Sequence, residues 1–424
     1  MQVETAAPDR FQDMVEVLES IAKHRRSRPG AESDARYYEL MGAYYRRVIE
    51  AKETGKQVVA FTSQVPTEAI TAMDMVPMFL EGAAVTMAIT RKSFEETFSQ
   101  SKAMGYAPEI CSVHRCIIAA FGNDWGPRPA AVVSSNQPCD NNMKSVTPMV
   151  KAMKIPNYFL DGPYYLGERD VEYFAHELED MVAFLEETSG RRLDLDSLVE
   201  TLHRSQQMVE LHKEIYRLRS SVPSPVVNRK PQQIASIMRS FMGTQEGLDY
   251  MTVVRDEIKA IVETGKGNGC PENFRLISIF APPAYNWKIL DWMERERGAM
   301  IVSEPHSSHW GDVNWDFNQP MLTMASKALA NPTGRQLAGP LETGLKQAVL
   351  KDAETQRADG AIYSAGTGCR QGCAAIRTLK DSLRDSSELP TAVVDMDNCD
   401  PTFVSDDELK DKLEGFFDLL ESHK

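Results

Sequence analysis

The chain has 424 residues, of which 42% are hydrophobic and 25% are charged, the composition of an ordinary folded protein. This length suits two or three domains rather than one core. Lys and Arg number 47 against 61 Asp and Glu, and the net charge of −14 argues against nucleic acid and anionic membranes as partners. The sequence has neither an apolar run of about 18 residues nor the pattern of a signal peptide, so we expect a cytoplasmic protein.

Residues 1–55 are expected to be helical, because the stretch 35–54 carries apolar and aromatic side chains at helical spacing and stops at Gly55. In residues 56–165, short apolar runs alternate with helical stretches, the pattern of a parallel sheet with helices on both faces. The expected strands of this first α/β domain are 56–63, 76–80, 130–135 and 155–161, with a helix that begins near Thr67.

Residues 166–270 carry long amphipathic patterns instead, and we expect a helical bridging segment with helices at 168–187, 195–219, 231–242 and 245–264. A second α/β domain follows over residues 271–424. Its strands are expected at 274–280, 298–303, 359–364 and 391–395, and its last helix at 405–420, capped by Ser405 and Glu408. The sequence therefore predicts an α/β fold with two parallel-sheet domains, a helical amino-terminal segment and a helical bridge.

Most of the seven cysteines fall near the carboxyl ends of expected strands, where open parallel sheets bind their ligands. Cys139, Cys369 and Cys399 each follow such a strand, and Cys373 lies one helical turn after Cys369. Two more, Cys111 and Cys116, flank an expected helix start with Ser112 as the candidate N-cap. Cys270 alone precedes a strand, which places it at the opposite edge of its sheet. Six cysteines are therefore expected to converge between the two domains.

A single cytosolic cysteine is more often a small buried apolar side chain than a ligand, but six at one topological position indicate a metal site. The sequence has no C-x-x-C pair, so the zinc-ribbon and ferredoxin patterns are absent. Thiolate ligands that are widely separated along the chain favour an iron–sulfur cluster held between domains. Three cysteines would leave one corner of a four-iron cube open, and six divide into two sets of three.

The segments around these cysteines, CSVHRC, SSNQPCDNN, ADGAIYSAGTGCR and LPTAVVDMDNCD, resemble the 2-hydroxyacyl-CoA dehydratase / benzoyl-CoA reductase family. The segment GKQVVAFTSQVPTEAITAMDMVPMFLEG is similar to the first strand and helix of that family, and the resemblance runs from about residue 35 to 420. It implies a pair of Rossmann-like domains and a 4Fe–4S cluster on Cys111, Cys139 and Cys369. It also implies a separate ATP-hydrolysing iron–sulfur activator that supplies a low-potential electron.

The sequence departs from this pattern by adding Cys116, Cys373 and Cys399. In this it looks like the double-cubane branch of the family, in which six cysteines of one chain hold two cubanes joined by a shared sulfide, in a homodimer. That resemblance implies an oxygen-sensitive, anaerobic reductase of small molecules. Two alternatives stay open. The chain could be the single-cluster subunit of a 2-hydroxyacyl-CoA dehydratase, which is a lyase, or of a benzoyl-CoA reductase; or it could be an electron-carrying scaffold without turnover.

Three histidines are candidate proton donors, because reductions consume protons. His306 and His309 follow an expected strand end, and His114 lies between Cys111 and Cys116. A zinc site at His306 and His309 would need further ligands, and none is evident at suitable spacing. The alternative for each histidine is a hydrogen-bonded structural role.

Four further residues adjoin the expected ligands. Gly366 and Gly368 would allow the backbone to approach a cluster closely, or would serve only as turn residues. Arg115 and Arg370 would offset the negative charge of a thiolate-rich cluster, or would form solvent-facing salt bridges. The segment GTGCRQGCA lacks the lysine of the P-loop pattern G-x-x-x-x-G-K-S/T, so ATP is expected on the partner rather than on this chain.

Overall fold

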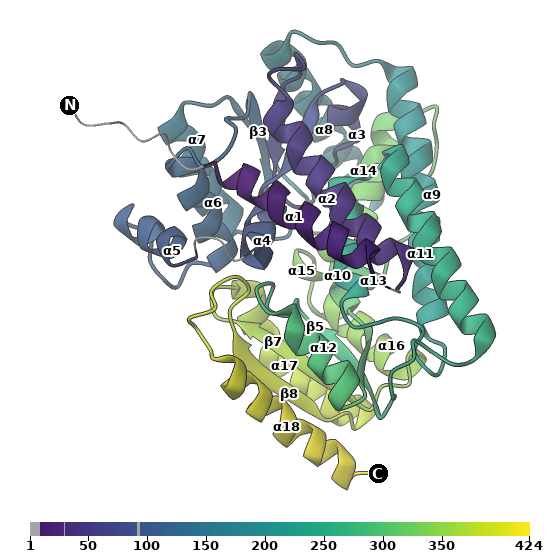
Figure 1. Cartoon of the computed structure of the whole chain (residues 1–424). Helices are drawn as coiled ribbons and strands as arrows, with labels where there is room; N and C mark the ends of the chain where they lie inside the picture. Colours follow the sequence, from purple (N-terminus) through teal and green to yellow (C-terminus); the bar gives the residue numbers. More distant parts are fainter. Residues whose placement is uncertain (1–8, 29, 91–93) are drawn as a thin grey trace.

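The computed structural model of the chain describes residues 9–28, 30–90 and 94–424, so the first eight residues of the expected helical segment lie outside it (Figure 1). Two four-stranded parallel sheets form its framework, with the strand orders β2-β1-β3-β4 and β6-β5-β7-β8. Helices surround both sheets. The predicted α/β fold with two sheets is therefore confirmed.

The strands are the short apolar runs of the sequence, with ends that shift by one or two residues. The first sheet contains β1 (Val58–Phe61), β2 (Val76–Phe79), β3 (Ala131–Ser135) and β4 (Asn157–Leu160). The second contains β5 (Phe274–Ile279), β6 (Ala299–Ser303), β7 (Gly360–Gly366) and β8 (Thr391–Met396). The central strands β1, β3, β5 and β7 are buried throughout, as expected for strands with helices on both sides.

Alternate residues of the first sheet face two different helical layers. Val58, Ala60 and Val132 pack in one apolar cluster with α1 (Arg10–Arg26), α2 (Glu32–Glu50), α4 (Leu80–Thr90), α6 (Ser112–Gly122) and α7 (Asn141–Met153). Val59 and Val133 face the opposite layer, which contains α3 (Glu68–Ala72), α8 (Glu168–Ser189), the start of α9 (Leu195–Arg219) and α14 (Pro320–Ala330). The helix α5 (Phe94–Ala103) packs beside α6.

The second sheet is covered in the same way. One face packs on α12 (Trp287–Glu296) and α18 (Asp406–Ser422), and the other on α16 (Gln347–Thr355), α17 (Arg370–Ser387) and the π-helical turn η1 (Glu342–Lys346). Ser405 is the N-cap of α18, as predicted, and its hydroxyl accepts the Glu408 N–H at 3.2 Å. Leu409, Leu413 and Leu420 then line the buried face of the helix.

The bridge consists of α8 and α9 together with α10 (Lys230–Ser240) and α11 (Gln245–Thr264), close to the predicted bounds. Two short helices, α13 (Pro305–Ser308) and α15 (Pro332–Leu337), follow β6 and α14. The helix α14 comes from the second half of the sequence, but Met324, Ala325 and Leu329 pack against the first sheet. The division into 1–55, 56–165, 166–270 and 271–424 stays a prediction. No helix of the described residues is long and apolar enough to cross a membrane.

Both sheets have the same strand order, so each has a switch point between its first and third strands, β1/β3 and β5/β7. The loops after β3 and β7 contact each other, since the Asn141 side-chain N–H donates to the Gly368 carbonyl at 3.3 Å. The carboxyl ends of the two sheets thus meet across a shared space. This is where parallel α/β folds bind ligands.

A buried ion pair attaches α14 to the first α/β unit, that is, the first sheet with its covering helices. Lys327 Nζ donates to Glu68 Oε1 at 2.5 Å, and the Ser205 hydroxyl donates to the same oxygen at 2.8 Å. We expect Lys327→Met to lower the free energy of unfolding by about 3–5 kcal/mol, because it leaves the Glu68 charge buried without its cation. Denaturant unfolding of the purified variant measures this loss. The exposed pair of Lys346 with Glu342 is the control, and Lys346→Met should cost less than about 1 kcal/mol. Equal losses would contradict the prediction.

Candidate metal centre

Cys111, Cys139 and Cys369 come together where the two sheets meet. Cys111 is the N-cap of α6, Cys139 follows β3, and Cys369 is the N-cap of α17 after β7. Burial raises the pKa of the Cys111 thiol well above its usual range, and the nearby Cys139 and Cys369 raise it further. Burial also raises the pKa of Cys139 to about 12, with a contribution from Cys369. The three thiols therefore lie within electrostatic reach of one another.

Gly368 explains how the loop of Cys369 comes so close to Cys111. A Cβ atom on Gly368 would lie 2.4 Å from both the Cα and the N of Cys111, a distance that real Cβ atoms do not show. Gly366 is different, because a Cβ atom on it would lie 3.7 Å from its nearest neighbour, the Cys369 Cβ. Only Gly368 is thus required by the close approach of the two backbones.

The amino-terminal turn of α17 directs backbone donors at its cysteines. The Gly372 N–H donates to Cys369 Sγ at 3.3 Å, a bond that favours the thiolate form. Cys373 lies one turn further and is exposed, with its Sγ 3.4 Å from the Gly366 carbonyl oxygen. The dipole of a helix amino terminus stabilises negative charge at the same place.

The remaining predicted ligands, Cys116 and Cys399, are both buried and contact each other. The hydrogen bond between their thiols, together with burial, raises the pKa of Cys399 well above its usual range. The Cys399 N–H donates to the Ser112 hydroxyl at 3.1 Å. The prediction of Ser112 as N-cap was wrong, because α6 begins at Ser112 with Cys111 as its N-cap, and the Ser112 hydroxyl accepts a bond from the loop after β8 instead.

Arg115 and Arg370 both join the two units through carboxylates. Arg115 is buried, lies 3.2 Å from Asp400 and 4.0 Å from Asp397, and stacks over Phe98. It therefore ties α6 to the loop that follows β8. Arg370 is exposed and forms an ion pair with Asp140, next to Cys139. The Arg370 contact matches the alternative of a solvent-facing salt bridge, whereas the ion pair of Arg115 is buried. A role in offsetting cluster charge stays a prediction for both.

His114 is the histidine nearest to a predicted ligand. Its Nε2 lies 3.8 Å from Cys139 Sγ, and its Nδ1 shares a hydrogen bond of 2.6 Å with the Ser145 hydroxyl. Burial lowers the pKa of His114 to about 4, so the ring is neutral near pH 7. A neutral imidazole can exchange a proton between its two nitrogens. His114 can thus connect the Cys139 side of the site with Ser145.

The other two histidines lie in the second unit but in different surroundings. His306 is buried, stacks on Phe280 with ring centroids 6.2 Å apart, and has its pKa lowered to about 3 by burial. Phe280 in turn lies next to Gly372, beside Cys369. His309 instead bonds to the buried Asp352, and its Nε2 is 3.3 Å from the Tyr216 hydroxyl. His306 therefore adjoins the cysteines, whereas His309 belongs to a network with α9 and α16.

Cys270 lies apart from this site, four residues before β5 and hence at the amino edge of the second sheet, as predicted. Its N–H donates to the Asn268 side chain at 2.9 Å. Burial raises the pKa of its thiol, as it does for the other cysteines with shifted values. Its position makes it a natural control for the six.

The three thiols have the chemistry of iron–sulfur ligands. Within the part of the chain that the structure describes, no three His, Cys, Asp or Glu side chains are close enough to hold one metal ion. A cluster binds each thiolate at a different iron and so accepts ligands that lie further apart. Buried thiols with raised pKa values stay protonated alone, and metal binding deprotonates them. Cys111, Cys139 and Cys369 are suited to one such cluster by position and chemistry.

Two residues that the sequence did not indicate lie at the same sheet edge. Glu81, in the first turn of α4, accepts the Ser63 N–H at 3.0 Å, and burial raises its pKa to about 7. Its charge raises the pKa of Cys139. The positive charge of Arg239 in α10 acts to lower the pKa values of both Glu81 and His306. The sequence signal for Glu81 was its position directly after the predicted strand 76–80.

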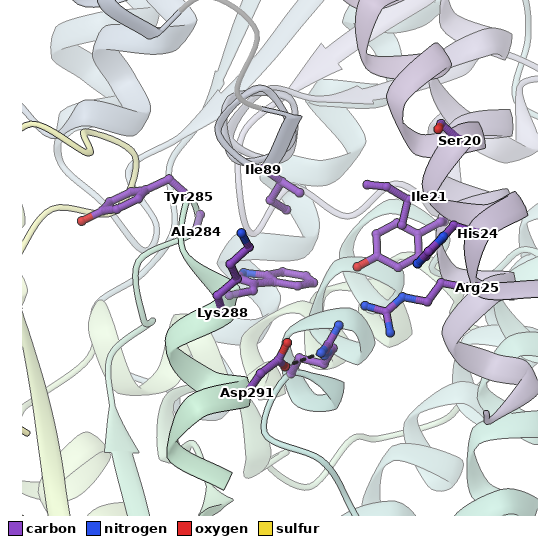
Figure 2. Close-up of a pocket in the computed structure, with 12 residues that line it drawn as sticks. Ser20, Ile21, His24, Arg25, Ile89, Ala284, Tyr285, Lys288 and Asp291 are labelled. Atoms are coloured by element: carbon purple, nitrogen blue, oxygen red, sulfur yellow. Dashed lines mark hydrogen bonds and ion pairs between the residues drawn. The ribbon is translucent and has the colours of Figure 1, made fainter. Parts of the chain in front are cut away.

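A groove of about 570 Å³ lies away from the cysteines, between α1 and α12 (Figure 2). His24, Arg25, Arg229 and Lys288 line it, but Arg229 forms an ion pair with Asp291, drawn as a dashed line in Figure 2. Arg25 is likewise 3.0 Å from the Asp34 carboxylate. No cysteine lines the groove, so we do not place the chemistry there.

Comparison with known proteins identifies the family to which the chain belongs. The profile of the family "2-hydroxyglutaryl-CoA dehydratase, D-component" matches residues 62–420. One subunit of the benzoyl-CoA reductase of Thauera aromatica is 24% identical over 417 residues, which cover 91% of this chain and 94% of that protein. The (R)-phenyllactyl-CoA dehydratase alpha subunit of Clostridium sporogenes is 22% identical over 415 residues, 94% of this chain and 98% of that protein.

A third relative is the (R)-2-hydroxyisocaproyl-CoA dehydratase alpha subunit of Clostridioides difficile, 21% identical over 397 residues, or 91% of this chain and 95% of that protein. All three are subunits of dehydratases or reductases that act on CoA esters, as their names state. The chain belongs to the 2-hydroxyacyl-CoA dehydratase family, which confirms the resemblance seen in the sequence.

The contrast between Gly368 and Gly366 gives a test of the site. Gly368→Ala should push the loop of Cys369 away from Cys111 and lower the bound iron per chain at least severalfold, since Cβ has no space there. Gly366→Ala makes only ordinary contacts and should retain the iron. Iron analysis after anaerobic purification measures both. Far-ultraviolet circular dichroism checks that both variants fold, and full iron in a folded Gly368→Ala protein would contradict the prediction.

Proposed function

We propose that the chain is an iron–sulfur reductase of small molecules that carries a double cubane on Cys111, Cys116, Cys139, Cys369, Cys373 and Cys399. The observation that carries this proposal is the position of the three additional cysteines. Cys116 and Cys399 contact each other, and Cys373 lies one helical turn from Cys369. The Cys399 N–H also donates to the hydroxyl of Ser112, next to Cys111, and these contacts support a ligand set that includes all three.

When bound, such a cluster supplies stored electrons of low potential to a substrate. The chain contributes the surroundings. Cys399 is buried away from water, and the Gly372 N–H directs a hydrogen bond at Cys369 Sγ. His114 holds a proton between Ser145 and the Cys139 side of the site. His306 is a second buried imidazole near Cys369, and His309 joins the Asp352 network behind it.

The electrons come from a partner in this proposal. The chain has no P-loop pattern, so a separate ATP-hydrolysing iron–sulfur activator would deliver them. The exposed Cys373 marks the side of the site that a partner can approach. In this proposal the chain acts as a homodimer, as its resemblance to the double-cubane branch of the family implies.

A second candidate has its own support. The curated relatives are subunits of a benzoyl-CoA reductase and of 2-hydroxyacyl-CoA dehydratases. The chain could therefore hold one 4Fe–4S cluster on Cys111, Cys139 and Cys369 and act on a CoA ester in a heterodimer. An electron-carrying scaffold is the third possibility and differs from both in showing no substrate-dependent turnover.

Iron and acid-labile sulfide per chain separate one cubane from two. We expect about eight iron atoms per chain in anaerobically purified protein, because two four-iron units share one chain. Chemical analysis with protein determined by amino-acid hydrolysis gives this ratio. About four iron atoms per chain would contradict the double-cubane proposal and favour the CoA-ester enzyme.

Single cysteine variants test the ligand set directly. Cys373→Ala and Cys399→Ala should each lower the iron content and change the electron paramagnetic resonance spectrum of the reduced protein, because each removes one thiolate. Cys270→Ala should leave both unchanged, since Cys270 lies at the opposite sheet edge. If Cys399→Ala retains the iron and the spectrum of the parent protein, the six-ligand set is wrong.

A further inference from the structure

The groove between α1 and α12 continues into a second hollow. The first hollow has a volume of about 570 Å³ and the second about 660 Å³. Both are lined by His24, Arg25, Arg229 and Asp291, so the two hollows adjoin. Pockets that bind small molecules typically have volumes of about 300–1,000 Å³, so each hollow is large enough to receive part of a ligand.

Aromatic and aliphatic side chains line the first hollow. Tyr38 of α2, Tyr285 just before α12 and Trp287 at the start of α12 supply three aromatic rings, and Ile21 of α1 adds apolar surface. Figure 2 shows Ile21 and Lys288 on opposite sides of this space. Tyr38 and Tyr285 are each 4% exposed, so packing holds their rings in place. A flat aromatic ring can pack against such a lining.

Positively charged side chains outnumber carboxylates along the two hollows, although the whole chain has a net charge of −14. Four Asp and Glu line them, against six Lys and Arg, which are Arg25, Arg28, Arg229, Lys230, Lys288 and Arg295. Lys288 and Arg295 are exposed, and neither forms an ion pair within the part of the chain that the structure describes. The lining therefore attracts an anion.

The four carboxylates of the lining, by contrast, all have partners in the chain. Asp291 and Asp34 form ion pairs with arginines of the same lining. Glu257 and Glu294 accept backbone N–H groups at 3.0 Å and 2.7 Å. Burial also raises the pKa of Glu294, which favours its uncharged form. These carboxylates therefore oppose the binding of an anion less than their number suggests.

Lys230 places a buried cation in the second hollow. It is 5% exposed, and its Nζ donates to the Ser33 hydroxyl at 2.7 Å, which uses one of the three N–H donors of an ammonium group. Burial lowers the pKa of Lys230 to about 8, although the Asp34 and Glu257 charges act to raise it. The neighbouring carboxylates thus offset the cost of burying this charge only in part, and an anion in the hollow would offset more of it.

We propose that the two hollows bind a free nucleotide, with its base among the aromatic side chains of the first hollow and its phosphates at the cations of the second. A base alone would leave the cations without a counter-charge, and phosphate alone would leave the aromatic lining unused. The site differs from the P-loop type that the sequence lacks. The inference is independent of the proposed function, because no cysteine lines either hollow.

Isothermal titration calorimetry on the anaerobically purified holoprotein compares ADP with adenosine, inorganic pyrophosphate and CoA. ADP should bind at least about tenfold more tightly than adenosine or pyrophosphate, because only ADP occupies both hollows. Equal affinities for ADP and either fragment, or no binding of ADP, would overturn the proposal. CoA is the competing ligand, because the relatives act on CoA esters. Tighter binding of CoA than of ADP would assign the groove to CoA and would likewise overturn the proposal.

Variants separate the two parts of the site. Trp287→Leu removes an aromatic ring of the first hollow and should weaken the binding of both ADP and adenosine about tenfold. Lys288→Glu combined with Arg295→Glu reverses two exposed charges and should weaken ADP binding at least about tenfold, because the phosphates then meet negative charge. The same double variant should leave adenosine binding unchanged, since adenosine carries no phosphate.

The matched control is Arg377→Glu combined with Lys380→Glu, which reverses two exposed charges on α17, on the opposite face of the second sheet from α12. It should retain the ADP affinity of the parent protein. The exposed charge variants keep the test decisive if Trp287→Leu fails to fold, which circular dichroism detects. Unchanged ADP affinity in the folded Lys288→Glu and Arg295→Glu double variant, or an equal loss in the control, would overturn the proposal.

Discussion

Burying several thiols in one place disfavours the thiolate form, which is the form that binds metal. The arrangement of the site follows from the need to stabilise buried thiolates. Burial raises the pKa values of Cys111, Cys139, Cys369 and Cys399, and the nearby thiols raise those of Cys111 and Cys139 further. A thiolate in such a place needs a cation or a strong donor. The structure provides helix amino termini at α6 and α17 and the Gly372 N–H, and iron would provide the rest. The surrounding histidines with lowered pKa values are neutral, so they add no charge to this balance.

Much of the fold could be predicted because its strands are mostly apolar runs of four to seven residues between turn residues. The bounds of α9 and α11 follow from their long amphipathic periods. The packing of α14 could not be predicted in the same way. Periodicity identifies the apolar face of a helix but does not say which sheet covers it, and α14 crosses back to the first unit.

The candidate site could likewise be predicted only in part. The positions of Cys139, Cys369 and Cys399 were predictable because a strand end fixes the sheet edge at which a following residue lies. Glu81 and Arg239 were not, since charged residues are normally solvent-exposed, and only tertiary contacts bury them. Ser112 shows the limit at single residues, because a shift of one position in the start of α6 changes the N-cap to Cys111 and frees the serine hydroxyl for Cys399.

The return of α14 to the first unit also affects how the molecule can move. A chain whose two α/β units were joined only by a linker could open by rotating one unit against the other. Here Met324 and Leu329 are buried against the first sheet, and Lys327 is paired with Glu68 inside it. A hinge opening would have to withdraw these side chains. Access to the cysteines therefore depends on local movements of loops and side chains, while the two units stay closed around them.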